Sequence, residues 1–243
     1  MATVRCNNPA GRLYLILQEA RSKPEGNATK QVWREVLANK NEAADLFIYL
    51  SNLYLLVSEV KDKINMTAGD LKEHYLTMFS NIERVVGATN LDADWGSYKQ
   101  FLTDAVMTEL RFCWIELLKT CSEEEVDHDK LMAIYEDIKR LITDALESDI
   151  DLTLKQIIVD LLGSIEQSIL EYKIRGATSL KKSLERAMGA IQFNYQLFKE
   201  KEGNPLVNRL WSIMVNINEL TTFALNMPPL LVGTSFALKA LTA

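Results

Sequence analysis

Apolar residues recur along this chain at steps of three and four residues, the spacing that places side chains on one face of an α-helix. Six clear runs of this kind begin at Leu46, Leu102, Leu131, Leu154, Leu180 and Leu206. No comparable stretch alternates apolar and polar residues with a period of two, the pattern of a half-buried strand. The pattern therefore predicts an all-α fold.

Several short motifs mark where the helices begin and end. In NNPAG, Asn8 can cap a helix whose first residue is Pro9, where the missing N–H of proline does no harm. In EGNPL, Gly203 ends one helix, Asn204 caps the next and Pro205 opens it. Further candidate caps are Ser122 with Glu125, Asp70 with Glu73, and Asp151.

These signals predict about nine helices, near residues 9–22, 29–39, 42–65, 70–86, 94–120, 123–148, 152–173, 178–200 and 205–226. Short connections favour antiparallel packing of neighbours. Because no linker or change of composition divides the chain, we expect one domain, a helical bundle over residues 1–226, followed by an apolar arm at 227–243. Residues 1–40 could form a semi-separate helical hairpin. The spacing also fits an exposed coiled-coil seam, but runs of two or three heptads favour a bundle core.

Composition and charge exclude some classes of protein. The 243 residues include only 10 Gly and 5 Pro, which suits long helices, and the net charge of −6 does not favour general attraction to nucleic acid or an anionic membrane. The three cysteines are odd in number and form no CxxC pair, so inert thiols are predicted rather than a disulfide framework. No secretory signal is apparent at the start, and the cytoplasm is the expected location.

The sequence offers little catalytic chemistry. Its two histidines are His74 and His128, and no nucleophile, phosphate-loop or zinc motif accompanies them. Glu124, His128 and Asp129 could in principle hold a metal ion, but acidic residues at a helix start are already explained by the helix dipole. We therefore predict no catalytic residue, no metal and no cofactor, although a Ser–His or Cys–His pair formed in space stays open.

One basic stretch, YKIRGATSLKKSLER at residues 172–186, is a candidate anion site. Near a predicted helix start, backbone N–H groups and two hydroxyls lie close to five cations, which are Lys173, Arg175, Lys181, Lys182 and Arg186. The simpler interpretation, a solvated helix face, is favoured over contact with phosphate or nucleic acid. Residues 122–151 carry eleven acids and three bases, so the two segments could also face each other, within a subunit or across a dimer.

Three short stretches carry a resemblance to known proteins. NPAGRL (8–13), ELRFC (109–113) and YKIRGA (172–177) resemble sequences of a family of bacterial all-helical proteins of similar length, for which no activity is established. The resemblance implies a link to bacterial defence against phage. It implies no catalytic or binding residue.

The end of the sequence is its most apolar part. Residues 220–238 carry no charge over nineteen positions, close to the roughly 20 that a helix needs to cross a bilayer. The Pro228–Pro229 pair interrupts any such helix, so a membrane span is not favoured. We expect the arm to be buried against protein, within the chain or across a self-association interface, through Leu230, Leu231, Val232, Phe236 and Leu238.

Together these features favour a non-enzymatic helical protein that acts through contacts with a protein partner or as a homo-oligomer, as a subunit of a bacterial defence system. Two alternatives come from single segments. The basic stretch suggests binding of nucleic acid or phosphate, and the apolar arm suggests an effector that perturbs membranes.

Overall fold

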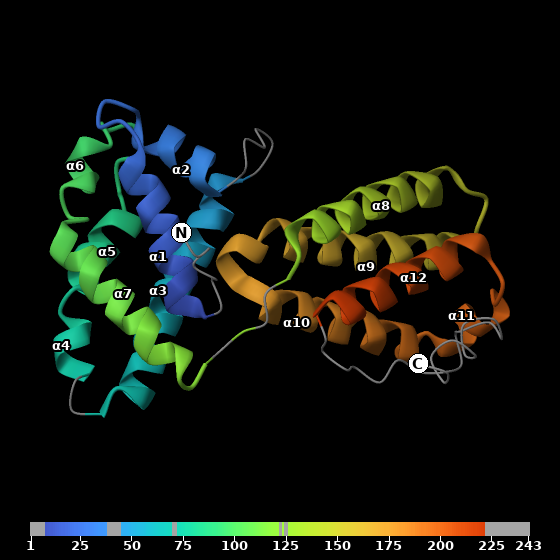
Figure 1. Ribbon diagram of the computed structural model, residues 1–243. Helices are drawn as coiled ribbons and strands as arrows, with labels where there is room; N and C mark the ends of the chain where they lie inside the picture. The colour runs from blue at the N-terminus through green and yellow to red at the C-terminus, as the bar shows by residue number, and fades with distance from the viewer. Residues whose placement is uncertain (1–7, 38–44, 70–71, 122, 124–125, 222–243) are drawn as a thin grey trace. The chain divides into compact units, whose positions relative to one another are not determined.

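The computed structural model describes residues 8–37, 45–69, 72–121, 123 and 126–221. Within these ranges the chain is helical and contains no strand, only an isolated bridge between Ala28 and Asp94, which confirms the predicted all-α fold. In chain order (Figure 1) the helices are α1 (Pro9–Ser22), α2 (Thr29–Leu37), α3 (Leu46–Thr67), α4 (Lys72–Leu76), α5 (Phe79–Val86), α6 (Gly96–Lys99), α7 (Asp104–Leu118), α8 (His128–Glu147), α9 (Leu152–Leu170), α10 (Tyr172–Phe193), α11 (Tyr195–Glu200) and α12 (Pro205–Thr221).

The helix caps follow the local sequence. Asn8 caps α1 and its side chain accepts a hydrogen bond from the Gly11 N–H, as predicted. Asp151 caps α9 through the N–H groups of Thr153 and Leu154. The Asn204 side chain accepts from the Leu206 N–H at 2.9 Å at the start of α12. These caps satisfy donors that the first helical turn leaves without partners.

Some predicted helices are divided in the structure. The helix predicted over 70–86 is two, α4 and α5, with a turn at Thr77 and Met78 between them, and the Met78 and Phe79 side chains are buried. The helix predicted over 94–120 is α6 and α7, since the Thr103 side chain caps a new helix by accepting from the Val106 N–H. The helix predicted over 178–200 corresponds to the part of α10 after Gly176, whose non-helical φ and ψ interrupt the element, and it ends at Phe193, where the separate α11 follows.

The start of α8 also differs from the prediction. The helix begins at His128 and is capped by Asp127, whose side chain accepts from the N–H groups of Asp129 and Lys130. The predicted capping pairs at 122/125 and 70/73 each include residues outside the described ranges. The first helical residue, His128, is five residues later than the predicted start at 123, so α8 is shorter than the 123–148 expected.

The helices gather into two compact units. Unit 1 is Met1–Glu125 with Lys173–Gly176, and unit 2 is Val126–Tyr172 with Ala177–Ala243. The units are therefore not successive segments, because Lys173–Gly176 of α10 belong to unit 1 and the rest of that element to unit 2. In unit 1, α1 packs against α2, α3 and α7, so residues 9–37 contribute directly to its core.

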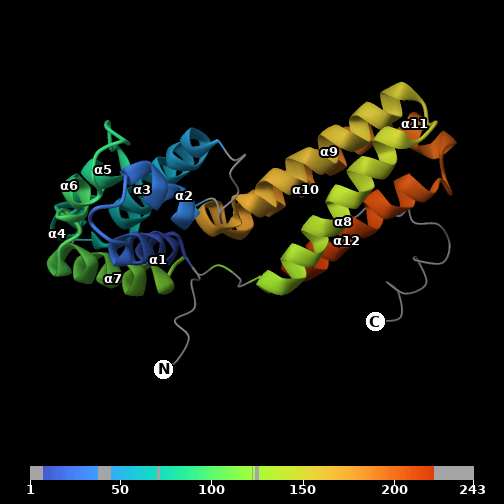
Figure 2. The same cartoon turned by 90° about the horizontal axis from the view of Figure 1, so that it is seen from above.

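Unit 2 is a bundle of long helices. Figure 2 shows α8, α9, α10 and α12 running alongside one another, and α8 packs closely against both α9 and α12. Its core contains the residues that the 3-4 spacing placed inward, such as Leu131, Ile138 and Leu141 on α8 and Leu154 and Ile158 on α9. The predicted bundle core is confirmed in these helices.

Among the helices of the described ranges, none combines the length and apolar character that crossing a membrane requires. The predicted arm at 227–243, with its five anchors Leu230, Leu231, Val232, Phe236 and Leu238, lies outside the described residues.

Candidate interaction surfaces

Each of the three stretches that carry the resemblance contributes residues to the core of unit 1, such as Leu13, Leu110 and Ile174. The buried Asn8 side chain donates from Nδ2 to the Trp114 carbonyl oxygen at 3.0 Å, which joins the start of α1 to α7. Gly11, one turn further along α1, faces the same tryptophan, and a Cβ on it would lie 2.8 Å from the indole Nε1. Glycine is therefore needed here because the α1 backbone approaches the α7 indole closely.

Arg12 is the centre of this cluster. Its side chain is 4% exposed and pairs with Glu123 and, at 3.5 Å, with Glu59. Its Nε also donates to the Ile174 carbonyl oxygen at 2.9 Å. A buried guanidinium is stable only when charge and hydrogen bonds compensate its lost hydration, and here two carboxylates and a carbonyl do so. These contacts connect α1 with α3, with residue 123 and with the first turn of α10.

The basic stretch begins within this packed region. The Lys173 ammonium donates to Glu19 at 2.7 Å and to the Val36 carbonyl oxygen at 2.5 Å. Ile174 is buried in the core of unit 1. Lys173 is therefore engaged by α1 and α2, and its acidic partner comes from α1 rather than from residues 122–151.

The remaining members of the basic stretch lie on different parts of α10. Arg175 is exposed on the first turn, which belongs to unit 1. Lys181 approaches Glu185 at 4.0 Å on the same helix, while Lys182 and Arg186 are exposed. The hydroxyl of Ser179, predicted as part of an anion pocket, is buried and donates to the Ser168 carbonyl oxygen at 3.5 Å. Anion binding by the stretch stays a prediction.

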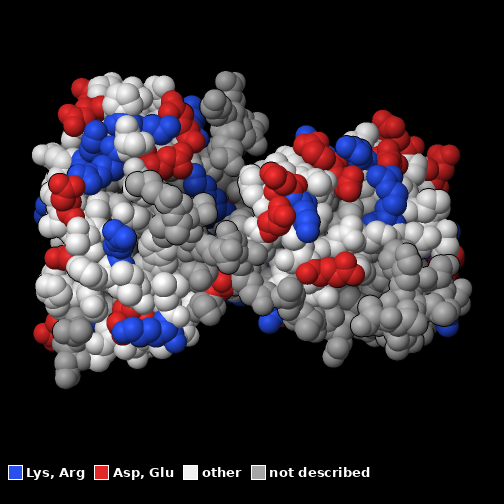
Figure 3. Space-filling view, viewed as in Figure 1, with Lys and Arg blue, Asp and Glu red and all other residues white. Residues whose placement is uncertain are grey.

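The charge on the visible surface is mixed. On the face seen in Figure 3, acidic and basic side chains are interspersed, and neither sign forms a continuous patch over either unit. Proteins that bind nucleic acid through its backbone present clustered lysine and arginine. This face does not have that character.

The two histidines lie on separate helices. His74 on α4 and His128 on α8 are both exposed, in different units. The metal candidate at 124, 128 and 129 includes a residue outside the described ranges, and the residues within them form no group of three side chains suited to a metal ion. Burial, and secondly the charge of Glu109, raises the pKa of the Cys113 thiol to about 12. A thiol that stays protonated at neutral pH is a poor nucleophile.

This burial predicts a difference in reactivity between two cysteines. At pH 8 we expect iodoacetamide to label the half-buried Cys121 at least tenfold faster than the buried Cys113 in the folded chain, because attack needs an accessible thiolate. Peptide mass spectrometry over a time course resolves the two sites. In strong denaturant the rates should converge, and similar rates in the native chain would contradict the burial of Cys113.

A surface that the sequence analysis missed lies on α3. Phe47 and Leu55 are 71% and 61% exposed, and Ile48 and Tyr54 are 47% and 49% exposed. We call these four side chains the α3 face. The sequence did contain a signal, because residues 46–58 carry no charge on any side of the helix. Smaller groups of exposed apolar side chains lie on α7, at Phe112, Ile115 and Leu118.

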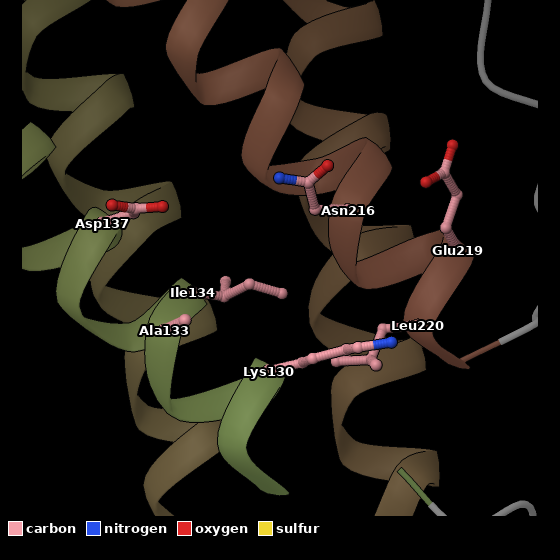
Figure 4. Close-up of a pocket in the computed structure, with 7 residues that line it drawn as sticks. All are labelled: Lys130, Ala133, Ile134, Asp137, Asn216, Glu219 and Leu220. Atoms are coloured by element: carbon pink, nitrogen blue, oxygen red, sulfur yellow. The ribbon is translucent and has the colours of Figure 1, made fainter. Parts of the chain in front are cut away.

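A groove runs between α8 and α12 in unit 2. It has a volume of about 390 Å³, and Figure 4 shows the side chains that line it. We call it the α8–α12 groove, and its residues are Lys130, Ala133, Ile134 and Asp137 of α8 with Asn216, Glu219 and Leu220 of α12. The first four are spaced i, i+3, i+4 and i+7, so they form one face of α8.

Comparison with known proteins adds no assignment: no family model matches the chain, and neither the curated proteins nor the solved structures contain a match. The features that bear on function are therefore the surfaces of the fold itself.

Proposed function

We propose that this all-helical protein acts through protein–protein contact, and that it associates with a second copy of itself through the α3 face. The observation that carries the proposal is the exposure of four large apolar side chains on a helix whose first thirteen residues are uncharged all round. A helix that is apolar on every side is normally buried on every side. A contiguous apolar patch on the surface commonly marks an interface.

The arrangement of the α3 face fits a second copy specifically. Phe47 and Leu55 are placed symmetrically about Ser51 in the sequence, and so are Ile48 and Tyr54. At 3.6 residues per turn, Ser51 also points along the middle of the face. It is exposed and small. Two antiparallel α3 helices related by a two-fold axis at Ser51 would thus place Phe47 against Leu55 of the second copy.

The same axis would place Ile48 against Tyr54 of the second copy. Such an interface is isologous, because the same patch serves on both subunits. The absence of charge from residue 46 to residue 58 means that self-pairing brings no like charges together at its centre. Aromatic and aliphatic side chains are also the residues that most often anchor protein interfaces.

A charge-exchange experiment tests this pairing. The variant with Phe47→Glu and Leu55→Glu should be monomeric, since four carboxylates would meet at the interface, and the variant with Phe47→Lys and Leu55→Lys should be monomeric for the same reason. An equal mixture should form a mixed dimer, because each Glu then meets a Lys of the other copy. We expect the Glu variant alone and the Lys variant alone each to self-associate at least 100-fold more weakly than the wild-type chain. Sedimentation velocity across a range of concentrations measures this.

The matched control is Phe193→Glu, which changes an aromatic side chain that is 91% exposed on α10 and outside the α3 face. It should leave the dimer unchanged. Circular dichroism should show that all variants keep their helical content, because the substituted side chains are exposed. A wild-type chain that is monomeric at every concentration would contradict the proposal, as would charged variants that still assemble.

A further inference from the structure

The α8–α12 groove has the chemistry of a site for an extended apolar peptide. Its floor is formed by the buried Ile134 and the partly buried Leu220, beside Ala133. Exposed polar side chains stand along the rim (Figure 4), namely Lys130, Asp137, Asn216 and Glu219. An extended chain needs apolar space for its side chains and polar partners for its backbone, and amide and ammonium groups can supply those partners.

The volume of the groove limits what it can hold. At about 390 Å³ it lies near the lower end of the roughly 300–1,000 Å³ typical of ligand sites. That space suits two or three apolar side chains rather than a complete helix. Ala133 is the smallest of its lining residues and lies exposed on the α8 side.

From this geometry we infer that the α8–α12 groove is the docking site for the apolar arm of the same chain, residues 227–243, with side chains from Leu230, Leu231 and Val232 on its floor. The described part of α12 ends at Thr221, one residue after Leu220, which itself lines the groove. The described chain thus ends beside the groove, and the covalent link gives the arm a high effective concentration there.

Chain length and charge agree with this assignment. Residue 230 is nine residues beyond Thr221, so at about 3.3–3.6 Å per residue the connection can span roughly 30 Å, ample for a site that starts at Leu220. Pro228 and Pro229 lack backbone N–H donors, so two fewer donors need partners. The rim carries two acids and one base and is therefore negative overall. The only charged side chain within residues 220–243, Lys239, is positive.

Photo-crosslinking in the full chain tests the docking directly. Leu231 is replaced by benzoylphenylalanine, and after irradiation mass spectrometry identifies the attached peptide. We expect the dominant crosslink to join residue 231 to residues 130–137 or 216–220 of the same copy. Ala133→Trp places an indole in the groove, and because Ala133 is exposed, the substitution should not disturb the core of unit 2. It should reduce this crosslink at least tenfold.

Thr143→Trp is the matched control, because it adds the same indole to an exposed position of α8 outside the groove. It should leave the crosslink unchanged. A second readout is hydrogen exchange of a chain that ends after Met227, in which residues 130–137 should exchange at least tenfold faster than in the full chain. Crosslinks to other regions or between copies, or unchanged exchange after truncation, would overturn the inference.

This inference does not rest on the proposed dimer. The α3 face belongs to unit 1 and the groove to unit 2, so the charged variants of α3 should leave the residue 231 crosslink intact, and Ala133→Trp should leave the dimer intact.

Discussion

Replacing Gly176 with alanine should lower the free energy of unfolding by about 3 kcal/mol, one of the two largest effects expected for this chain. Gly176 interrupts α10 with φ 64° and ψ −167°, a conformation that is essentially restricted to glycine. A Cβ there would also lie 2.5 Å from Nη1 of Arg12 and 2.7 Å from Oε2 of Glu123. The substitution would therefore strain the backbone and displace a buried ion pair together.

Denaturant unfolding followed by tryptophan fluorescence measures this effect. Trp33, Trp95 and Trp114 lie in unit 1, so the signal reports mainly on the unit that contains Gly176. The control is Gly163→Ala, within α9, where a Cβ meets nothing within 4 Å and alanine should be neutral or stabilising by up to about 1 kcal/mol. Equal effects of the two substitutions would show that Gly176 is not conformationally required.

Replacing Arg12 with methionine should destabilise the chain by about 3–5 kcal/mol, the range for removing one partner of a buried ion pair. Methionine keeps much of the aliphatic stem but removes the guanidinium. Glu123, which is 17% exposed, then loses its cation, and the Ile174 carbonyl oxygen loses the donor at 2.9 Å. Unpaired polar groups at this degree of burial lower the free energy of unfolding, since water cannot fully replace the missing partner.

A double variant separates the ion pair from the packing. Arg12→Met combined with Glu123→Gln should recover part of the loss, because the mostly buried carboxylate of Glu123 no longer lacks its cation, while Glu59, whose side chain is 42% exposed, can be hydrated. The control, Arg21→Met, removes an exposed pair from the same helix, in which Nη2 lies 2.6 Å from Asp104. Such surface pairs contribute about 0–1 kcal/mol. If Arg12→Met destabilised the chain no more than Arg21→Met, the buried network would have no special role.

Local patterns in the sequence were sufficient to predict the helices and most of the core. Asn8, Asp151 and Asn204 cap helices as their neighbours indicated, because capping joins residues only two or three positions apart. The 3-4 spacing placed Leu110 and Ile158 in the interior, since one face of a helix is defined by the backbone geometry alone. The break before Thr103 was missed although Thr103 caps α7 through the N–H of Val106, a local signal that the predicted boundaries did not use.

The basic stretch shows most clearly what local patterns could not give. Five cations close together suggested an anion site, yet Lys173 pairs with Glu19, which is 154 positions away in the sequence. The carbonyl oxygen of Ile174 accepts a hydrogen bond from Arg12, which is 162 positions away. Charge along a sequence is visible without its partners, so a structural ion pair and a ligand site look alike there.

The α3 face lies between these two cases. The sequence shows that residues 46–58 carry no charge, and this predicts a helix without a charged face. Which side of that helix stays exposed depends on what α5, α1 and α2 cover, and this only the packing of unit 1 decided. Sequence by itself determined most of the helices, several of their caps and their inward faces, because those are set within a few turns. The tertiary structure alone decided the two units, the Arg12 network and the uncovered surfaces, because each depends on contacts between segments far apart in the chain.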